Sequence, residues 1–199
     1  MQRILAIHDL SGFGATSLMV VIPIMNRFGI QVCALPSAIL SSNTCYANYV
    51  LFDTSSFMQD SITHWERMGM SFSAIYSGFL GNSAQTEQVL RAINSFSGAD
   101  CPVIIDPVMA DDGVLYKCYD LSIVEAMRKL IARADIITPN FTEACLLCQE
   151  PCTPTATEEQ VSRICHKLYQ LGAQKIVITS VPLEGVDHSV VALFSPSLN

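Results

Sequence analysis

The sequence is poor in charge, and above all in positive charge. Lysine and arginine together number 11, against 18 aspartates and glutamates, and the formal net charge is −7. No basic run is present, so the electrostatic footprint of a nucleic-acid-binding protein is missing. No stretch reaches 18 consecutive apolar residues, and residues 1–3 lead directly into an apolar run that does not resemble a signal peptide. We therefore expect a cytoplasmic protein that binds neither nucleic acid nor a membrane.

Repeats, low-complexity tracts and long linkers are also missing, so no domain boundary can be drawn from the sequence. Half of the 199 residues are hydrophobic, which excludes a disordered chain and allows a sizeable core. We predict a single domain over residues 1–199.

Cysteine is plentiful, yet the partners that would complete a zinc site are not. Cys145 and Cys148 form a C-x-x-C pattern with Cys152 close by, but no second C-x-x-C and no H-x3-H follows. Two interpretations stay open: a redox or metal pair, or reduced thiols inside a helix. The usual burial of free cysteine favours the second. The full set is Cys33, Cys45, Cys101, Cys118, Cys145, Cys148, Cys152 and Cys165.

Short runs rich in Ile and Val alternate with segments of helical period, which is typical of a parallel sheet with crossover helices. The predicted strands are 3–7, 30–35, 74–77, 103–106, 136–138 and 175–179, with 189–194 as a hairpin partner of the last. The predicted helices are 17–27, 60–68, 84–95, 121–133 and 158–171, the last with a capping-box pattern at Thr157 and Gln160. No helix follows to cover the final strands, so we expect an α/β domain that is incomplete at its C-terminus.

Polar or glycine-rich stretches follow five of the predicted strands. Because ligands of open α/β sheets bind at the carboxyl ends of the strands, these stretches predict a site. They are HDLSGFG (8–14), LSSNTCY (40–46), SGFLG (77–81), DPVMADDG (106–113) and TPNFTEA (138–144).

Two of these stretches carry acids suited to a metal or a phosphate. Asp106, Asp111 and Asp112 precede Gly113, and clustered carboxylates of this kind suit Mg²⁺; a solvated acidic loop is the equal alternative. Asn140 and Glu143 are spaced to hold a metal-bound water or a phosphate at a helix start, although Asn140 is equally suited to a plain N-cap.

Together these stretches resemble the ribokinase-like superfamily, and within it the pyridoxal (vitamin B6) kinases. The resemblance rests on ILAIHDLSGFG, SGFLG, DPVM with Asp111, the N-x-x-E of TPNFTEA, and IVITS at 176–180, in family order. It implies a three-layer sandwich whose mainly parallel central sheet has helices on both faces, here lacking its C-terminal part. It also implies MgATP-dependent phosphorylation of the hydroxymethyl group of a B6 vitamer.

The resemblance also implies roles for individual residues. On the substrate side, the position of Asp9 is often Ser in the family, so the resemblance gives its role to Asp9 or Ser11. Asn43 stands at the His of an S-N-H-T pattern, and Phe79 stands where Tyr is common. On the nucleotide side it implies contacts to ATP from Asp106, Asp111, Tyr116, Thr138, Asn140 and Thr179. Asp106 and Glu143 are the implied Mg²⁺ ligands.

The family's catalytic base is the Asp of a G-T-G-D motif, and that motif does not occur in the 199 residues. The resemblance implies that this Asp lies beyond Asn199, so we assign no catalytic residue within the sequence and expect negligible kinase activity from this chain alone. Hydroxymethylpyrimidine kinase of thiamine synthesis is the alternative enzyme, and a non-catalytic binder of vitamer or nucleotide is the alternative outside enzymes. Related kinases are commonly dimers, so the resemblance also implies a homodimer.

Overall fold

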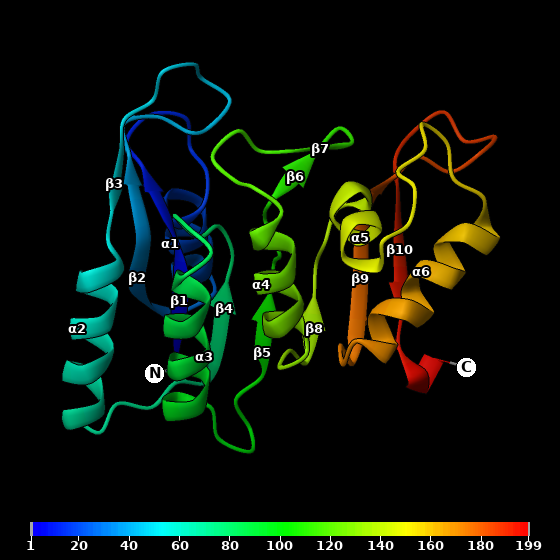
Figure 1. The fold of residues 1–199 in the computed structure, drawn as a ribbon. Coiled ribbons are helices and arrows are strands. Elements are labelled where there is room, and N and C mark those ends of the chain that lie inside the picture. The colour runs from blue at the N-terminus through cyan, green and yellow to red at the C-terminus, as the bar shows by residue number, and fades with distance from the viewer. Residues whose placement is uncertain (1, 199) are drawn as a thin grey trace. The chain divides into compact units, whose positions relative to one another are not determined.

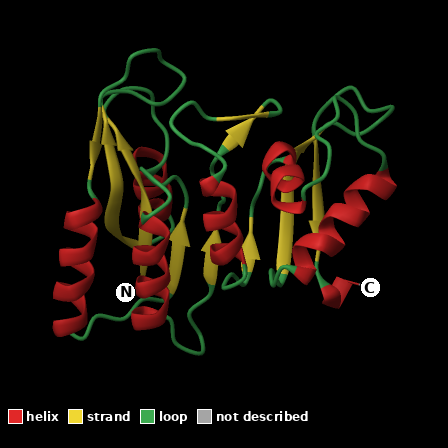
Figure 2. Cartoon of the chain, viewed as in Figure 1, coloured by secondary structure: helices red, strands yellow, loops and turns green. Residues whose placement is uncertain are grey.

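The computed structural model describes residues 2–198, in which strands and helices alternate along the chain. Asn199 lies outside the described residues, so the expectation that the catalytic base lies beyond Asn199 stays a prediction. Contacts divide the chain into two compact units. We call residues 2–103 unit 1 and residues 104–198 unit 2, and describe each by itself (Figures 1 and 2).

Unit 1 is built around a central strand that is buried on both faces. Its strand order is β4-β1-β2-β3, in which β1 pairs in parallel with β2 and β4, and β3 runs antiparallel to β2. Figure 1 shows α1 on one face of these strands and α2 and α3 on the other. The bounds are β1 (Arg3–Ser11), α1 (Leu18–Arg27), β2 (Gln31–Leu40), β3 (Leu51–Asp53), α2 (Ser55–Arg67), β4 (Ala74–Ser77) and α3 (Gln85–Phe96).

Unit 2 continues the same alternation, with the strand order β10-β9-β8-β5. Within this order β8 pairs in parallel with β5 and with β9, whereas β9 and β10 are antiparallel, as the sequence predicts. β6 and β7 form a separate antiparallel pair. Within the described residues its helices lie on one face of these strands (Figure 1). The bounds are β5 (Val103–Ile105), β6 (Ala110–Asp111), β7 (Val114–Leu115), α4 (Ser122–Ile131), β8 (Ile136–Ile137), α5 (Phe141–Cys148), α6 (Glu158–Gln170), β9 (Lys175–Val181), β10 (Val190–Phe194) and a short 3-10 helix, η1 (Pro196–Leu198).

Three local predictions are corrected. The helix predicted from residue 60 begins at Ser55, one residue after its N-cap Thr54. The capping box predicted for α6 is half formed: the Thr157 hydroxyl accepts from the Gln160 N–H, but the Gln160 side chain bonds to the 151–153 loop instead of returning to the cap. The acidic stretch 106–113 is not a plain loop, because it enters the β6–β7 hairpin.

Candidate functional site

The carboxyl end of β1 holds two of the predicted substrate residues. Asp9 and Ser11 are both buried, and the Ser11 hydroxyl donates to Asp9 Oδ2 over 3.0 Å. The register of β1 against β2 shifts between His8 and Leu10, an irregularity of the kind that re-aims side chains at strand ends. The carboxylate and the hydroxyl are thus fixed to one another, as a preformed polar pair.

The loop after β2 packs on the loop after β1. The Asn43 N–H donates to the Phe13 carbonyl over 2.9 Å, and its side-chain oxygen accepts from the Cys45 N–H over 3.1 Å. Gly14 has φ +77°, and a Cβ there would lie 2.5 Å from Asn43 Nδ2, so this approach requires glycine. The structure therefore brings Asn43 to the HDLSGFG loop, as the sequence predicts for a shared site.

Phe79, the fourth predicted substrate residue, has a buried ring. Its carbonyl accepts from the Ser37 hydroxyl over 2.5 Å, and Gln85 Nε2 donates to the Ser37 carbonyl over 2.7 Å. The N–H of Gly81 donates to Gln85 Oε1 over 2.8 Å. The SGFLG turn is consequently fixed by hydrogen bonds from β2 and α3.

Two buried polar atoms have no hydrogen-bond partner within the described residues: His8 Nε2, in the second half of β1, and Ser77 Oγ, at the end of β4. The His8 ring packs edge-on against Tyr76 at 4.3 Å between centroids, and a Cβ on Gly78 would come within 2.3 Å of His8 Nδ1. Burial lowers the pKa of His8 to about 4, so the imidazole is neutral at pH 7. Sequence reasoning gave His8 no role, although it directly follows the apolar run 4–7 and opens the HDLSGFG stretch.

In unit 2, α5 begins with a reciprocal capping box. Asn140 Oδ1 accepts from the Glu143 N–H over 2.9 Å, and Glu143 Oε2 accepts from the Asn140 N–H over 2.8 Å. The same side chains reach the 109–110 segment: Glu143 Oε1 accepts from the Met109 N–H over 3.1 Å, and Asn140 Nδ2 donates to the Ala110 carbonyl over 2.8 Å. The N-cap role considered for Asn140 is confirmed.

Asp106 and Glu143 form a pair of desolvated carboxyl groups. Burial raises the pKa of Asp106 to about 6, although a hydrogen bond with Thr138 acts to lower it. Burial raises the pKa of Glu143 to about 8, although the hydrogen bonds from the N–H groups of Asn140 and Met109 act to lower it. The negative charge of Asp106 raises the pKa further. No lysine or arginine contributes to either shift, so a cation bound here would stabilise both ionised carboxylates.

This pair fits Mg²⁺, which takes one or two carboxylates and fills its other positions with water and phosphate oxygens. Within residues 2–198, no group of three or more His, Cys, Asp or Glu side chains is placed to hold a metal ion. The other ligands of such an ion would therefore be water or phosphate oxygens.

A cavity of about 590 Å³ opens beside the start of α5, a size typical of small-molecule sites. Two predicted nucleotide residues, Asp111 and Asn140, line it, while Asp106, Tyr116, Thr138 and Thr179 are not among its lining residues. Half of the wall comes from the DPVMADDG and TPNFTEA stretches, whereas sequence reasoning did not single out the part contributed by residues 152–154, 182 and 189, which carries no motif. The lining residues are Asp111, Asp112, Gly113, Asn140, Phe141, Thr142, Cys152, Thr153, Pro154, Ser180, Pro182 and Ser189.

Three further predicted nucleotide residues are held by main-chain bonds: Tyr116 and Thr138 directly follow β7 and β8, and Thr179 lies within β9. The N–H groups of Tyr116, Thr138 and Thr179 donate to the carbonyls of Met109, Ile105 and Pro139 over 2.9, 3.1 and 2.9 Å.

The cysteines divide by exposure. Cys101, Cys145, Cys148 and Cys165 are buried as predicted, whereas Cys45 and Cys152 are exposed, which corrects the expectation for these two. The C-x-x-C pattern lies in α5, as the helical interpretation predicts.

No helix within residues 2–198 is long and apolar enough to cross a membrane.

Comparison with known proteins places these features in a family. The sequence profile of the phosphomethylpyrimidine kinase family matches residues 22–196. The pyridoxine/pyridoxal/pyridoxamine kinase of Bordetella pertussis is 30% identical over 178 residues, which cover 84% of this chain and 60% of that protein. The chain thus spans less than two thirds of the length of this relative.

Two solved structures are similar over almost all of the chain. A Bacteroides thetaiotaomicron protein described as a phosphomethylpyrimidine kinase, in a crystal form with pyridoxal, has a TM-score of 0.96 and 40% identity, covering 100% of this chain and 70% of that one. The pyridoxal kinase of Lactobacillus plantarum has a TM-score of 0.88 and 31% identity, covering 99% and 69%. The predicted α/β fold is confirmed by these similarities.

Proposed function

The chain belongs to the phosphomethylpyrimidine kinase family, and on that premise we propose that it serves the ATP-dependent phosphorylation of the hydroxymethyl group of a B6 vitamer. The substrate would be pyridoxal, pyridoxamine or pyridoxine, and the product would enter pyridoxal 5′-phosphate salvage. The observation that carries the proposal is the 40% identity, across the whole chain, to the Bacteroides protein crystallised with pyridoxal.

The substrate side of the proposal rests on unit 1. Asp9 and Ser11 supply a buried carboxylate and hydroxyl joined at 3.0 Å, which suit the ring nitrogen and polar substituents of a pyridine. Asn43 and Phe79 would border the same ligand, the first from the loop that packs on Gly14.

The nucleotide side rests on unit 2. Asp106 and Glu143 would hold Mg²⁺, which when bound would neutralise phosphate charge. Asp111 and Asn140 line the cavity and would contact ATP, with Tyr116, Thr138 and Thr179 approaching from the strand ends. Because phosphoryl transfer depends mainly on positioning and charge neutralisation, these residues are suited to bind and orient the nucleotide.

Ligand binding is the sharpest test, because no G-T-G-D motif occurs in the 199 residues and we expect negligible turnover by them alone. Titration calorimetry with pyridoxal should give micromolar binding, and Asp9→Asn should weaken it about tenfold or more, as expected when a hydrogen bond to a charged group is lost. Asp187→Asn, at an exposed residue of unit 2, is the matched control and should leave the affinity unchanged. Unaltered pyridoxal affinity in a folded Asp9→Asn variant would contradict the proposal.

The alternative enzyme, hydroxymethylpyrimidine kinase, is favoured by the description of the matching family profile. Side-by-side assays of pyridoxal and 4-amino-5-hydroxymethyl-2-methylpyrimidine on the full-length protein separate the two. Preference for the pyrimidine would transfer the assignment to thiamine synthesis. Vitamer binding without ADP formation by the full-length protein would instead support a non-catalytic binder.

A further inference from the structure

The loop that joins α5 to α6 places an exposed cysteine against a buried one. We propose that Cys152 and Cys145 form a redox-sensitive thiol pair, in which a hydroperoxide oxidises Cys152 and Cys145 then closes a disulfide with it. This site lies outside the residues assigned to substrate or metal, and the inference does not depend on the proposed function.

The face of α5 explains how the two cysteines meet. Thr142 and Cys145 are three residues apart in the helix and therefore lie on one face. Cys152 Sγ lies 3.7 Å from Thr142 Oγ1. Burial first, and then the neighbouring thiol of Cys152, raise the pKa of Cys145 to about 12, which agrees with this placement of the two cysteines.

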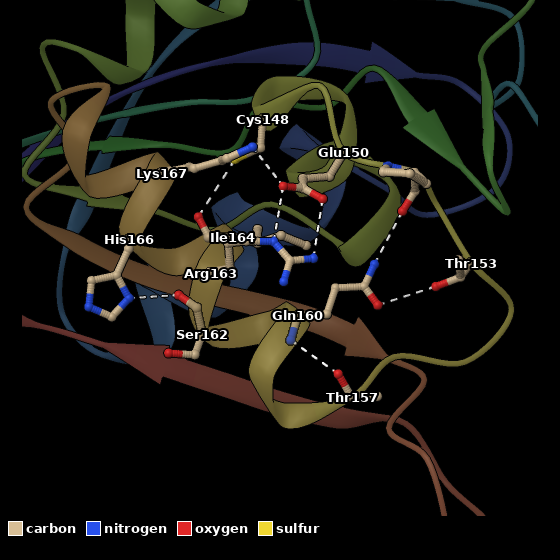
Figure 3. A network of polar contacts seen from close by, with 11 residues as sticks. Cys148, Glu150, Thr153, Thr157, Gln160, Ser162, Arg163, Ile164, His166 and Lys167 are labelled. Carbon is tan, nitrogen blue, oxygen red and sulfur yellow. Dashed lines mark hydrogen bonds and ion pairs between the residues drawn. The ribbon is translucent and has the colours of Figure 1, made fainter.

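The first half of the α5–α6 loop is fixed by ion pairs with α6. Gln149 ends α5 with φ +54°, and the Glu150 N–H donates to the Cys145 carbonyl over 2.9 Å. The Glu150 carboxylate then pairs with Lys167 over 2.6 Å and with Arg163 over 3.2 Å (Figure 3).

The second half is fixed by Gln160, which donates to the Pro151 carbonyl over 3.2 Å and accepts from the Thr153 hydroxyl over 3.4 Å (Figure 3). Cys152 is therefore held between two anchored residues, and its thiol is kept beside α5.

The difference in solvent exposure determines which of the two cysteines is oxidised first. Of the eight cysteines only Cys45 and Cys152 are exposed, whereas Cys145 is fully buried. A dissolved oxidant therefore reaches Cys152 first, and Cys145 is left to react with a sulfur inside the protein. Cys148, the other member of the C-x-x-C pattern, directs its thiol to the Ile164 carbonyl of α6 at 3.6 Å. The pair is consequently 145 with 152, and not 145 with 148.

The chemistry balances with the hydroperoxide as the oxidant. The Cys152 thiolate attacks one peroxide oxygen, giving a sulfenic acid and, from hydrogen peroxide, hydroxide, which takes up the proton that the thiol released. The Cys145 sulfur then attacks the sulfenic sulfur, the S–S bond forms, and the hydroxyl leaves as water with the Cys145 proton. Two thiols are oxidised and one peroxide is reduced to two waters. Because Cys152 lines the 590 Å³ cavity, the disulfide changes the wall of that cavity.

Peroxide treatment followed by thiol mapping tests the inference. The wild-type chain is treated with hydrogen peroxide, denatured in N-ethylmaleimide and digested with trypsin, and the 134–163 peptide, which holds Cys145, Cys148 and Cys152, is sequenced by mass spectrometry. We expect a loss of two hydrogens, a maleimide adduct on Cys148 alone, and reversal by dithiothreitol.

Three variants sharpen the assignment. Cys148→Ser should still form the disulfide and Cys152→Ser should not, while Cys145→Ser should let Cys152 proceed to the sulfinic and sulfonic acids. The inference is overturned if Cys148 is the protected partner in the wild-type peptide. It is also overturned if all three thiols stay free under conditions that oxidise exposed Cys45.

Discussion

Asn140 and Glu143 each carry two kinds of contact. Their side chains cap α5 reciprocally, and they also hold the 109–110 segment through the Met109 N–H and the Ala110 carbonyl. The residues proposed to meet nucleotide and metal are thus also those that fix where α5 begins. Substitutions here are expected to change stability as well as binding.

Variants of Asn140, compared by their free energy of unfolding at pH 7, distinguish the cap of α5 from the bond to Ala110. Asn140→Ala should lower this free energy by about 1–2 kcal/mol, because the cap is lost. Asn140→Asp keeps the capping oxygen but loses the bond to Ala110, so its effect should be smaller. Thr157→Ala, which removes the single cap bond of α6, is the reference at about 1 kcal/mol. Equal losses for Asn140→Ala and Asn140→Asp in urea titrations would mean that the Ala110 bond, and not the cap, carries the stability.

His8 makes stability depend on pH. Its pKa is lowered to about 4 in the folded chain, against about 6.5 when unfolded, so the unfolded chain binds more protons between these values. The contribution is fully present above pH 6.5 and is lost as the pH falls toward 4, by up to about 3 kcal/mol. Asp106 and Glu143, whose pKa values are raised, add a slope of the opposite sign, so the contribution of His8 is the difference in the free energy of unfolding between wild type and His8→Gln. In urea titrations this difference should shift against the wild type as the pH falls from 7 to 4.5. His188→Gln, at an exposed position, should show no such shift.

At the scale of elements, α1 presents apolar side chains to solvent. Ile24 is 48% exposed and Phe28, directly after the helix, is 75% exposed. If the implied homodimer uses this face, Ile24→Glu should convert dimer to monomer in light scattering coupled to size exclusion. Leu121→Glu, at a residue of unit 2 that is 71% exposed, should leave the mass unchanged. A dimer that survives Ile24→Glu would place the interface elsewhere.

The strands that were predicted well from the sequence consist mainly of consecutive apolar residues that are buried or half-buried in the structure. The strand 74–77 has the predicted bounds, and the core of β1 was visible because Ile4–Ile7 are buried on both faces. β3 was missed because it has three residues at a sheet edge, with Phe52 exposed, so neither length nor alternation marks it.

The β6–β7 hairpin was missed for another reason, since its signal was present. Asp112 and Gly113 both have positive φ, +48° and +80°, as a two-residue hairpin turn requires. The Asp-Gly pair was interpreted by its charge and not as a turn. In the site, the strand-end residues were predictable from topology, whereas cavity residues such as Thr153 and Ser189 come from loops whose course no periodicity encodes.

For the whole molecule, the net charge of −7 opposes the binding of a polyanion. Nucleotide binding should therefore need a divalent cation: adding EDTA should weaken ATP binding about tenfold or more, which corresponds to about 1.4 kcal/mol. Pyridoxal, which is not a polyanion, should bind equally with and without EDTA. Calorimetry on the same sample measures both, and Asp106→Asn should abolish the Mg²⁺ effect. Metal-independent ATP binding would contradict the roles proposed for Asp106 and Glu143.

The capping box at the start of α5 also bears on how such sequences diverge. Because folding alone rewards Asn140 and Glu143, purifying selection would keep the N-x-x-E pattern in a lineage that no longer transfers phosphate. The presence of the pattern alone therefore does not indicate that a sequence transfers phosphate. Asp9 and Ser11 cap no helix, but they are buried and bonded to one another, so replacing one alone leaves the other unpaired. Their joint replacement by apolar residues is the change expected first in a lineage that no longer binds the ligand.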